Sequence, residues 1–122
     1  MIDLLVSSIV AVFTGLLTGP SPAMTPAGLW QRADTQIEAR FYSCGDRLCA
    51  RITASKLGNG SGKTLLKNAA KTAHNMWEGP LLDVESGETL TGIVTIQSRD
   101  TLSLKGCTTL MLCRSETWHR VR

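Results

Sequence analysis

Short runs of alternating apolar and polar residues are the feature that most restricts the fold of this 122-residue chain. In the segment 35–43, the apolar side chains of Ile37, Ala39 and Phe41 alternate with polar ones. A period of two puts successive side chains on opposite faces, which is typical of a strand with one buried face. A second run of this kind begins at Leu48 after a Gly-Asp turn signal, so the two runs predict a hairpin.

The second half of the chain has a similar spacing. Residues 89–97 and 101–106 form two more runs on either side of a turn signal at 98–100, and 116–121 is expected to be the last strand. Several short strands at this spacing predict a mainly β fold, either an antiparallel barrel or a sandwich.

One segment has a different period. From Thr64 to Trp77, apolar residues recur every three to four positions, with lysines and asparagines between them. This pattern predicts one short α-helix whose apolar side packs on the sheet.

The stretch GNGSGKT at 58–64, which leads into that segment, is similar to a nucleotide-binding loop. The pattern G-x-x-x-x-G-K-[ST] would need a glycine at position 57, where Leu57 stands. We therefore interpret the stretch as a connecting loop and expect no nucleotide partner.

The N-terminal segment is strongly apolar. Residues 4–17 have only small polar interruptions, and Ser21 and Ala23 follow in an A-x-A-like arrangement. Because a membrane span needs roughly 18 to 20 apolar residues, we predict a signal peptide over 1–23 and a single domain over 24–122. The alternative is an uncleaved N-terminal anchor, which would be the only expected contact with a membrane.

The charge of the mature chain is mildly positive. Removal of the signal segment takes away one acid and no base, so that 13 bases minus 9 acids give +4. The lysines and arginines are scattered along the chain. Without a dense basic run, no nucleic-acid partner is expected.

The four cysteines are Cys44, Cys49, Cys107 and Cys113. An even number of cysteines behind an export signal predicts two disulfides, and all three connectivities remain open. A zinc site made of four thiolates is the alternative. It is disfavoured because the C-x4-C and C-x5-C spacings are looser than zinc knuckles and have no histidine close by.

Five motifs follow one another over most of the chain. They are G-L-W at 28–30, S-C-G-D-R-L-C-A-R-I at 43–52, W-E-G and D-V-E-S-G-E-T within 77–89, L-S-L-K-G-C at 102–107, and E-T-W-H-R-V at 116–121. On these motifs, the chain from Gly28 onward resembles the bacterial envelope family known as domain of unknown function 2147. The resemblance implies a lipocalin-like antiparallel β-barrel that is periplasmic or secreted.

The chain departs from the family pattern in places. Ala50 stands where a glycine is usual, Leu90 where a tyrosine is usual, and the segment 56–75 lacks the Asp- and Asn-Pro-rich insertion of many relatives. Whatever the family does through that loop or that tyrosine is not carried over to this chain.

A closed barrel brings its first and last strands together. Trp30 in the first strand and Arg120 in the last are therefore expected to stack at one end of the barrel. A cation–π pair of this kind contributes roughly 0.5 to 2 kcal/mol.

No catalytic constellation is evident. His74 and His119 have no nucleophile or second acid–base group nearby in the sequence. Asp83 and Glu85 flank a Gly-containing turn and are interpreted as turn and solvent residues. We predict no catalytic residue, metal site or cofactor, and the chain is not expected to be an enzyme.

A group of apolar residues on the helix and the later strands is consistent with two interpretations. They either line a cavity for a small hydrophobic ligand or fill a small core. The residues are Trp77, Leu90, Val94, Ile96, Leu102 and Leu104. The leading hypothesis is an exported, non-enzymatic barrel that binds such a ligand. The alternative is an envelope interaction or stress protein whose surface binds another protein or a cell-wall polymer.

Overall fold

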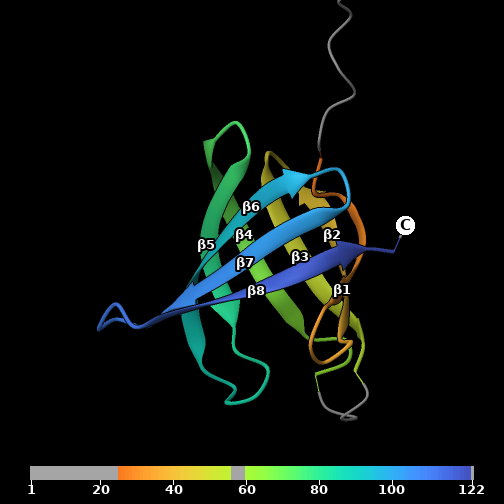
Figure 1. The fold of residues 1–122 in the computed structure, drawn as a ribbon. Helices are drawn as coiled ribbons and strands as arrows, with labels where there is room; N and C mark the ends of the chain where they lie inside the picture. The colour runs from red at the N-terminus through yellow and green to blue at the C-terminus, as the bar shows by residue number, and fades with distance from the viewer. Residues whose placement is uncertain (1–24, 56–59, 122) are drawn as a thin grey trace, which may run out of the picture.

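The computed structural model describes residues 25–55 and 60–121. Each of its strands pairs antiparallel with the next, and the first also pairs with the last, so the sheet closes into a barrel (Figure 1). The predicted antiparallel β-barrel is confirmed. The eight strands are β1 (Gly28–Arg32), β2 (Glu38–Cys44), β3 (Arg47–Ala54), β4 (Thr64–Ala73), β5 (Met76–Leu82), β6 (Thr89–Ser98), β7 (Thr101–Cys107) and β8 (Cys113–Arg120).

The alternating runs become strands, as predicted. The first hairpin, β2–β3, turns through Gly45 and Asp46, with Cys44 opposite Arg47. Gly45 has a φ of 71°, a left-handed conformation that two-residue hairpin turns require and glycine adopts readily. The inward side chains of β2, Ala39 and Phe41, are buried.

The predicted helix over Thr64–Trp77 is wrong. This segment forms β4 and the start of β5. A bulge explains the misleading period: Leu65 and Leu66 are both buried, the pairing register shifts after Leu66, and Asn68 has a φ of 48°. The bulge breaks the alternation, so buried residues recur at helical spacing. Pairing with β3 and β5, which barrel closure requires, overrides the helical preference.

The interior is filled by side chains. Aromatic rings pack edge to face at its centre, with ring centroids 6.5 Å apart for Trp30 and Phe41 and 6.3 Å apart for Phe41 and Trp118. The other core residues are Ile37, Ala39, Leu48, Ala50, Ile52, Leu65, Leu66, Ala69, Trp77, Leu81, Val94, Ile96, Leu102 and Leu104.

Three glycines lie in a row across β5, β6 and β7, with Gly79 opposite Gly92 and Gly92 opposite Gly106. A Cβ at Gly92 would lie 2.5 Å from Cβ of Leu81, and a Cβ at Gly106 would lie 2.8 Å from Cδ1 of Leu90. Both separations are too short for real side chains. The two leucines thus fold onto the glycines and fill this part of the interior.

The hairpin between β7 and β8 projects beyond the neighbouring strands (Figure 1). The predicted signal segment, 1–23, lies outside the described residues, so its role stays a prediction. In the described part of the chain, no helix is long and apolar enough to cross a membrane.

Candidate functional site

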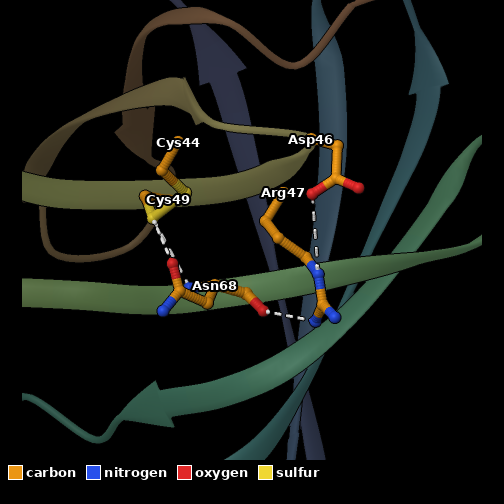
Figure 2. Close-up of a disulfide and its surroundings, with 5 residues drawn as sticks. All are labelled: Cys44, Asp46, Arg47, Cys49 and Asn68. Atoms are coloured by element: carbon orange, nitrogen blue, oxygen red, sulfur yellow. Dashed lines mark hydrogen bonds and ion pairs between the residues drawn. A yellow bond between two sulfur atoms is a disulfide. The ribbon is translucent and has the colours of Figure 1, made fainter.

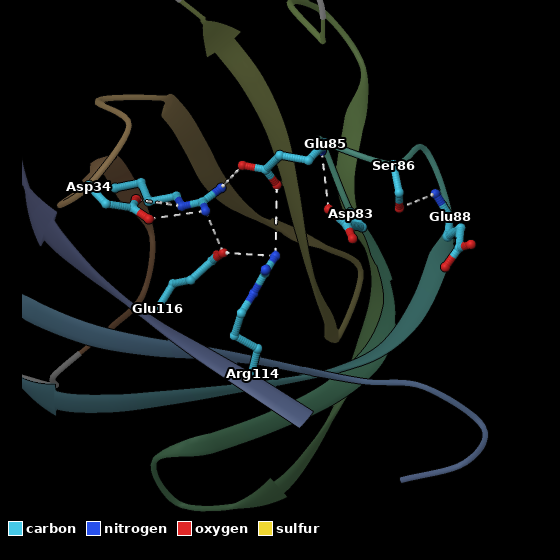
Figure 3. A network of polar contacts seen from close by, with 8 residues as sticks. Asp34, Asp83, Glu85, Ser86, Glu88, Arg114 and Glu116 are labelled. Atoms are coloured by element: carbon cyan, nitrogen blue, oxygen red, sulfur yellow. Dashed lines mark hydrogen bonds and ion pairs between the residues drawn. The ribbon is translucent and has the colours of Figure 1, made fainter. Parts of the chain in front are cut away.

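A cluster of charged side chains occupies one end of the barrel, which we call the charged mouth (Figure 3). At its centre is Arg32, which follows Trp30 on the inward face of β1 and is only 6% exposed. Its Nη2 lies 2.6 Å from Oε2 of Glu116 on β8, and its Nη1 lies 3.1 Å from Oε2 of Glu85 in the β5–β6 loop. Its Nε lies 2.7 Å from Oδ1 of Asp34. One buried guanidinium therefore joins three separate parts of the barrel rim.

The charged groups of the mouth change one another's pKa values. Burial disfavours the charged form of Arg32, but its ion pairs with Glu116, Asp34 and Glu85 outweigh burial and raise its pKa. Burial also raises the pKa of Glu116, and the charge of Arg32 compensates for this only in part. Asp34 is far less buried, so its hydrogen bond from Arg32 and the charge of Arg32 lower its pKa.

A second arginine is held much more loosely. The side chain of Arg114 is 67% exposed, and its Nη2 lies 3.9 Å from both Oε1 of Glu85 and Oε2 of Glu116. Exposed ion pairs of this length contribute little stability. Arg114 can therefore leave the cluster at small cost, whereas Arg32 cannot.

The charged mouth leads into a small cleft with an apolar floor. The cleft has a volume of about 30 Å³, which is room for about two water molecules. Trp118 lines it, and the buried Nε1–H of that indole has no hydrogen-bond acceptor in the described part of the chain. The lining residues are Arg32, Leu65, Leu81, Leu82, Asp83, Val84, Glu85, Leu90, Leu104, Gly106, Arg114, Glu116 and Trp118.

The six apolar ligand-cavity candidates do not share one cavity. Val94, Ile96 and Leu102 are core residues, and none of them lines the cleft. Leu90 and Leu104 do line it. The sixth candidate, Trp77, lines a separate cleft of about 160 Å³ at the opposite end. Of the two interpretations given above, the filled core describes the barrel interior.

That opposite end, which we call the closed end, holds the expected barrel-closing pair. Trp30 and Arg120 lie opposite each other across β1 and β8, and Cζ of Arg120 is 4.3 Å from the Trp30 ring centroid. The guanidinium of Arg120 also donates hydrogen bonds to the backbone oxygens of Thr25, Ala27 and Arg99, at 2.7, 2.8 and 2.7 Å. Its partners are therefore a ring and uncharged carbonyls.

The four cysteines form two disulfides, each within one hairpin. Cys44 pairs with Cys49 in the β2–β3 hairpin, and Cys107 pairs with Cys113 at the base of the β7–β8 hairpin. The first disulfide packs against β4, where the backbone N–H of Asn68 donates to Sγ of Cys49 at 3.4 Å (Figure 2). Each bridge fixes a turn that strand pairing has already formed.

The remaining candidates are two histidines, which lie outside the charged mouth, and two acidic residues of the β5–β6 loop. His74 lies in the β4–β5 turn and His119 on β8, and both are exposed. Glu85, interpreted above as a solvent residue, contacts Arg32. Asp83 accepts a hydrogen bond from the backbone N–H of Glu85 at 3.1 Å, which supports its expected role in the turn.

Sequence reasoning missed Arg32, Asp34 and Glu116. The available signal was the inward phase of β1: if Trp30 points into the barrel, so does the side chain two positions later. A buried arginine almost always has an acidic partner, so this phase would have predicted an ion pair at Arg32.

The comparisons with known proteins agree with the fold. A model of the bacterial family described as "Uncharacterized protein conserved in bacteria (DUF2147)" matches residues 28–120. Among solved structures, the chain is similar to the protein HP1028 from the human pathogen Helicobacter pylori, whose structure is described as belonging to the lipocalin family. The two are 13% identical, with a TM-score of 0.65 over 80% of this chain and 84% of the other. No match is found among curated proteins.

Proposed function

We propose that this chain, which belongs to the DUF2147 family of uncharacterized bacterial proteins, is an exported, non-enzymatic binding protein that takes a small hydrophobic ligand with an anionic head group at its charged mouth. The observation that carries the proposal is the buried, unpaired indole N–H of Trp118, a residue that lines the same cleft as the buried Arg32. Two donors beside an apolar floor suit an acceptor group on an apolar body.

The cost of the unpaired donor on Trp118 supports this assignment. A buried donor without an acceptor costs roughly 1 to 3 kcal/mol, which a ligand oxygen would recover. The leucines Leu81, Leu90 and Leu104 offer apolar contact beside these donors. A carboxylate would compete with Glu85 for the guanidinium.

The size of the cleft requires a rearrangement on binding. At about 30 Å³, it accepts only the end of a ligand. The loosely held Arg114 and the loop 83–88, whose residues are mostly exposed, are the parts that would move outward. Binding at the charged mouth would therefore open the rim and leave the packed aromatic centre in place.

Export is supported by the disulfides, because such bridges persist in oxidising compartments.

The non-enzymatic role is supported by the charged mouth itself. Its acidic and basic groups pair with one another rather than pairing a nucleophile with a base.

Native mass spectrometry of protein purified from its own compartment, followed by titration with a fluorescent fatty acid, tests the proposal. Trp118→Phe keeps a ring but removes the N–H, so the affinity should fall by about tenfold. Trp77→Phe is the matched control, because Trp77 lies outside the cleft, and should bind as the wild type does. A clean apo mass with no uptake of the fatty acid, or equal affinities for the two variants, would contradict the proposal.

A further inference from the structure

The tip of the β7–β8 hairpin, residues 108–112, exposes three large apolar side chains in succession. Leu110, Met111 and Leu112 are 81%, 75% and 69% exposed. The other large apolar side chains described as exposed, Tyr42 and Val121, are isolated residues and are less than half exposed. Single exposed apolar residues are ordinary, but a contiguous exposed group marks an interaction site.

The hairpin tip is ordered by its own contacts. Thr108 and Leu112 are joined by a backbone hydrogen bond of 3.0 Å, and the hydroxyl oxygen of Thr108 accepts from the backbone N–H of Leu112 at 3.2 Å. The Cys107–Cys113 disulfide closes the base. The apolar side chains are thus presented on a preformed turn, and little conformational entropy remains to be lost on binding.

The shape and composition of the tip favour lipid over protein. The tip projects from the barrel, so its partner must be concave or deformable (Figure 1). Its contact residues are aliphatic, whereas the residues that dominate protein interfaces are tryptophan, tyrosine and arginine, with leucine under-represented. A bilayer surface, by contrast, yields to a projecting apolar tip.

The charges around the tip point to anionic lipid. No acidic residue occurs between Thr101 and Ser115, and the charged residues nearest the tip on either strand are Lys105 and Arg114. Both side chains are exposed. Basic groups just behind an apolar tip lie where phosphate head groups would be.

We propose that the hairpin tip inserts into an anionic phospholipid bilayer. Leu110, Met111 and Leu112 enter the boundary between head groups and acyl chains, at a depth of about 5 to 10 Å. Lys105 and Arg114 remain at head-group level. The apolar tip lies outside the cleft proposed for the ligand, and only Arg114 belongs to both sites. The contact needs no N-terminal anchor.

The test is sedimentation of the purified barrel with vesicles of phosphatidylglycerol and phosphatidylcholine in equal parts, against vesicles of phosphatidylcholine alone. We expect binding to the anionic vesicles that weakens with salt. Leu110→Ser and Leu112→Ser should each lower the partition coefficient by about tenfold. Lys105→Gln should lower it by about fivefold. Val121→Ser, an exposed apolar residue away from the tip, is the control and should leave the partition coefficient unchanged.

A second readout locates the tip. A Leu110→Trp probe should shift its emission to shorter wavelength on anionic vesicles and be quenched by lipids labelled in the upper acyl chain. The native tryptophans are all buried, so the change belongs to the probe.

Failure of the wild type to bind anionic vesicles would overturn the proposal, and so would undiminished binding by the Leu110→Ser/Leu112→Ser variant. A dimer in solution that this variant abolishes, without vesicle binding by the wild type, would also overturn it. The tip would then dock on a second copy, for which a groove of about 370 Å³ beside the hairpin base offers a place. Since all three tip residues are exposed, the variants should fold, as far-UV circular dichroism will verify.

Discussion

The two ends of the barrel each depend on one arginine, but the partners differ in kind. At the closed end, Arg120 stacks on Trp30 and donates to backbone carbonyls, none of which titrates. At the charged mouth, Arg32 is surrounded by carboxylates, which do titrate. The closed end is therefore built to stay shut over a wide pH range. The charged mouth is held by interactions that protons, salt or an anionic ligand can weaken.

The largest expected effect is at the closed end. Trp30→Ala removes a fully buried ring that contacts Phe41 and Arg120, so the free energy of unfolding should fall by about 3 to 5 kcal/mol. Urea unfolding at neutral pH measures the loss. Arg120→Lys, which keeps the charge but not the fork of donors, should cost less than Trp30→Ala. Equal stability of Trp30→Ala and wild type would mean that the closed end does not depend on this pair.

The corresponding change at the charged mouth is Arg32→Leu. It leaves Glu116 partly buried without its cation, and should lower the free energy of unfolding by about 3 kcal/mol at neutral pH. Arg114→Leu is the matched control, because this exposed arginine should contribute less than about 1 kcal/mol. If both substitutions have the same effect in urea unfolding, the distinction between a fixed and a loose arginine is wrong.

The disulfides extend the comparison to the two hairpins that they close. Replacing Cys107 and Cys113 by serine should lower the free energy of unfolding by about 2 kcal/mol, and the same change at Cys44 and Cys49 should cost about as much, because the closed loops are similar in length. The two variants should differ in proteolysis. Limited digestion should cut the projecting tip 108–112 quickly in the first variant, whereas the β2–β3 hairpin of the second variant stays packed against Asn68 on β4 and should be cut more slowly. Equal cleavage rates for the two variants would contradict this expected difference between the hairpins.

The smallest expected effect is the pH dependence of the charged mouth. Asp34 has a folded pKa below its ordinary value of 3.8, so its contribution is present above that value and is lost as the pH falls through the folded pKa. Glu116 has a folded pKa above its ordinary value of 4.5, so its protonation adds stability as the pH falls through the folded pKa and is complete below 4.5. The two carboxylates therefore act in opposite directions.

Unfolding free energies measured as a function of pH should separate the contributions of Asp34 and Glu116. Asp34→Asn should be destabilising at neutral pH and equivalent to wild type at the lowest pH. Glu116→Gln should abolish the gain in stability on acidification. Parallel curves for the wild type and both variants would show that the charged mouth does not respond to protons.

Much of the fold can be predicted from the alternating runs, because they record which side chains face inward. The β4 segment could not be predicted in this way, since its bulge at Asn68 replaces a period of two by one that imitates a helix. The disulfide pairing depends on strand register, which cysteine spacing alone does not contain. The charged mouth depends on contacts between Arg32 and two acidic residues that lie far away in the sequence, Glu85 in the β5–β6 loop and Glu116 on β8.

The hairpin tip was missed for a different reason. The apolar triplet Leu110–Leu112 has no polar alternation and so resembles the interior of a strand. Its exposure follows from where the β7–β8 ladder ends, with Cys107 opposite Cys113, and a register of this kind is a property of the folded barrel.

The contact between Arg120 and the backbone of Thr25 and Ala27 also bears on when the barrel can form. It joins residues 95 and 93 positions apart, whereas the hairpins between successive strands are local. On the proposed export route, a polypeptide crossing a membrane from its N-terminus can pair β1 with β2, and each later strand with the one before, as it emerges. The ring cannot close until β8 has crossed. The barrel is therefore completed only on the far side of the membrane. Until then the chain is not closed and can still be translocated.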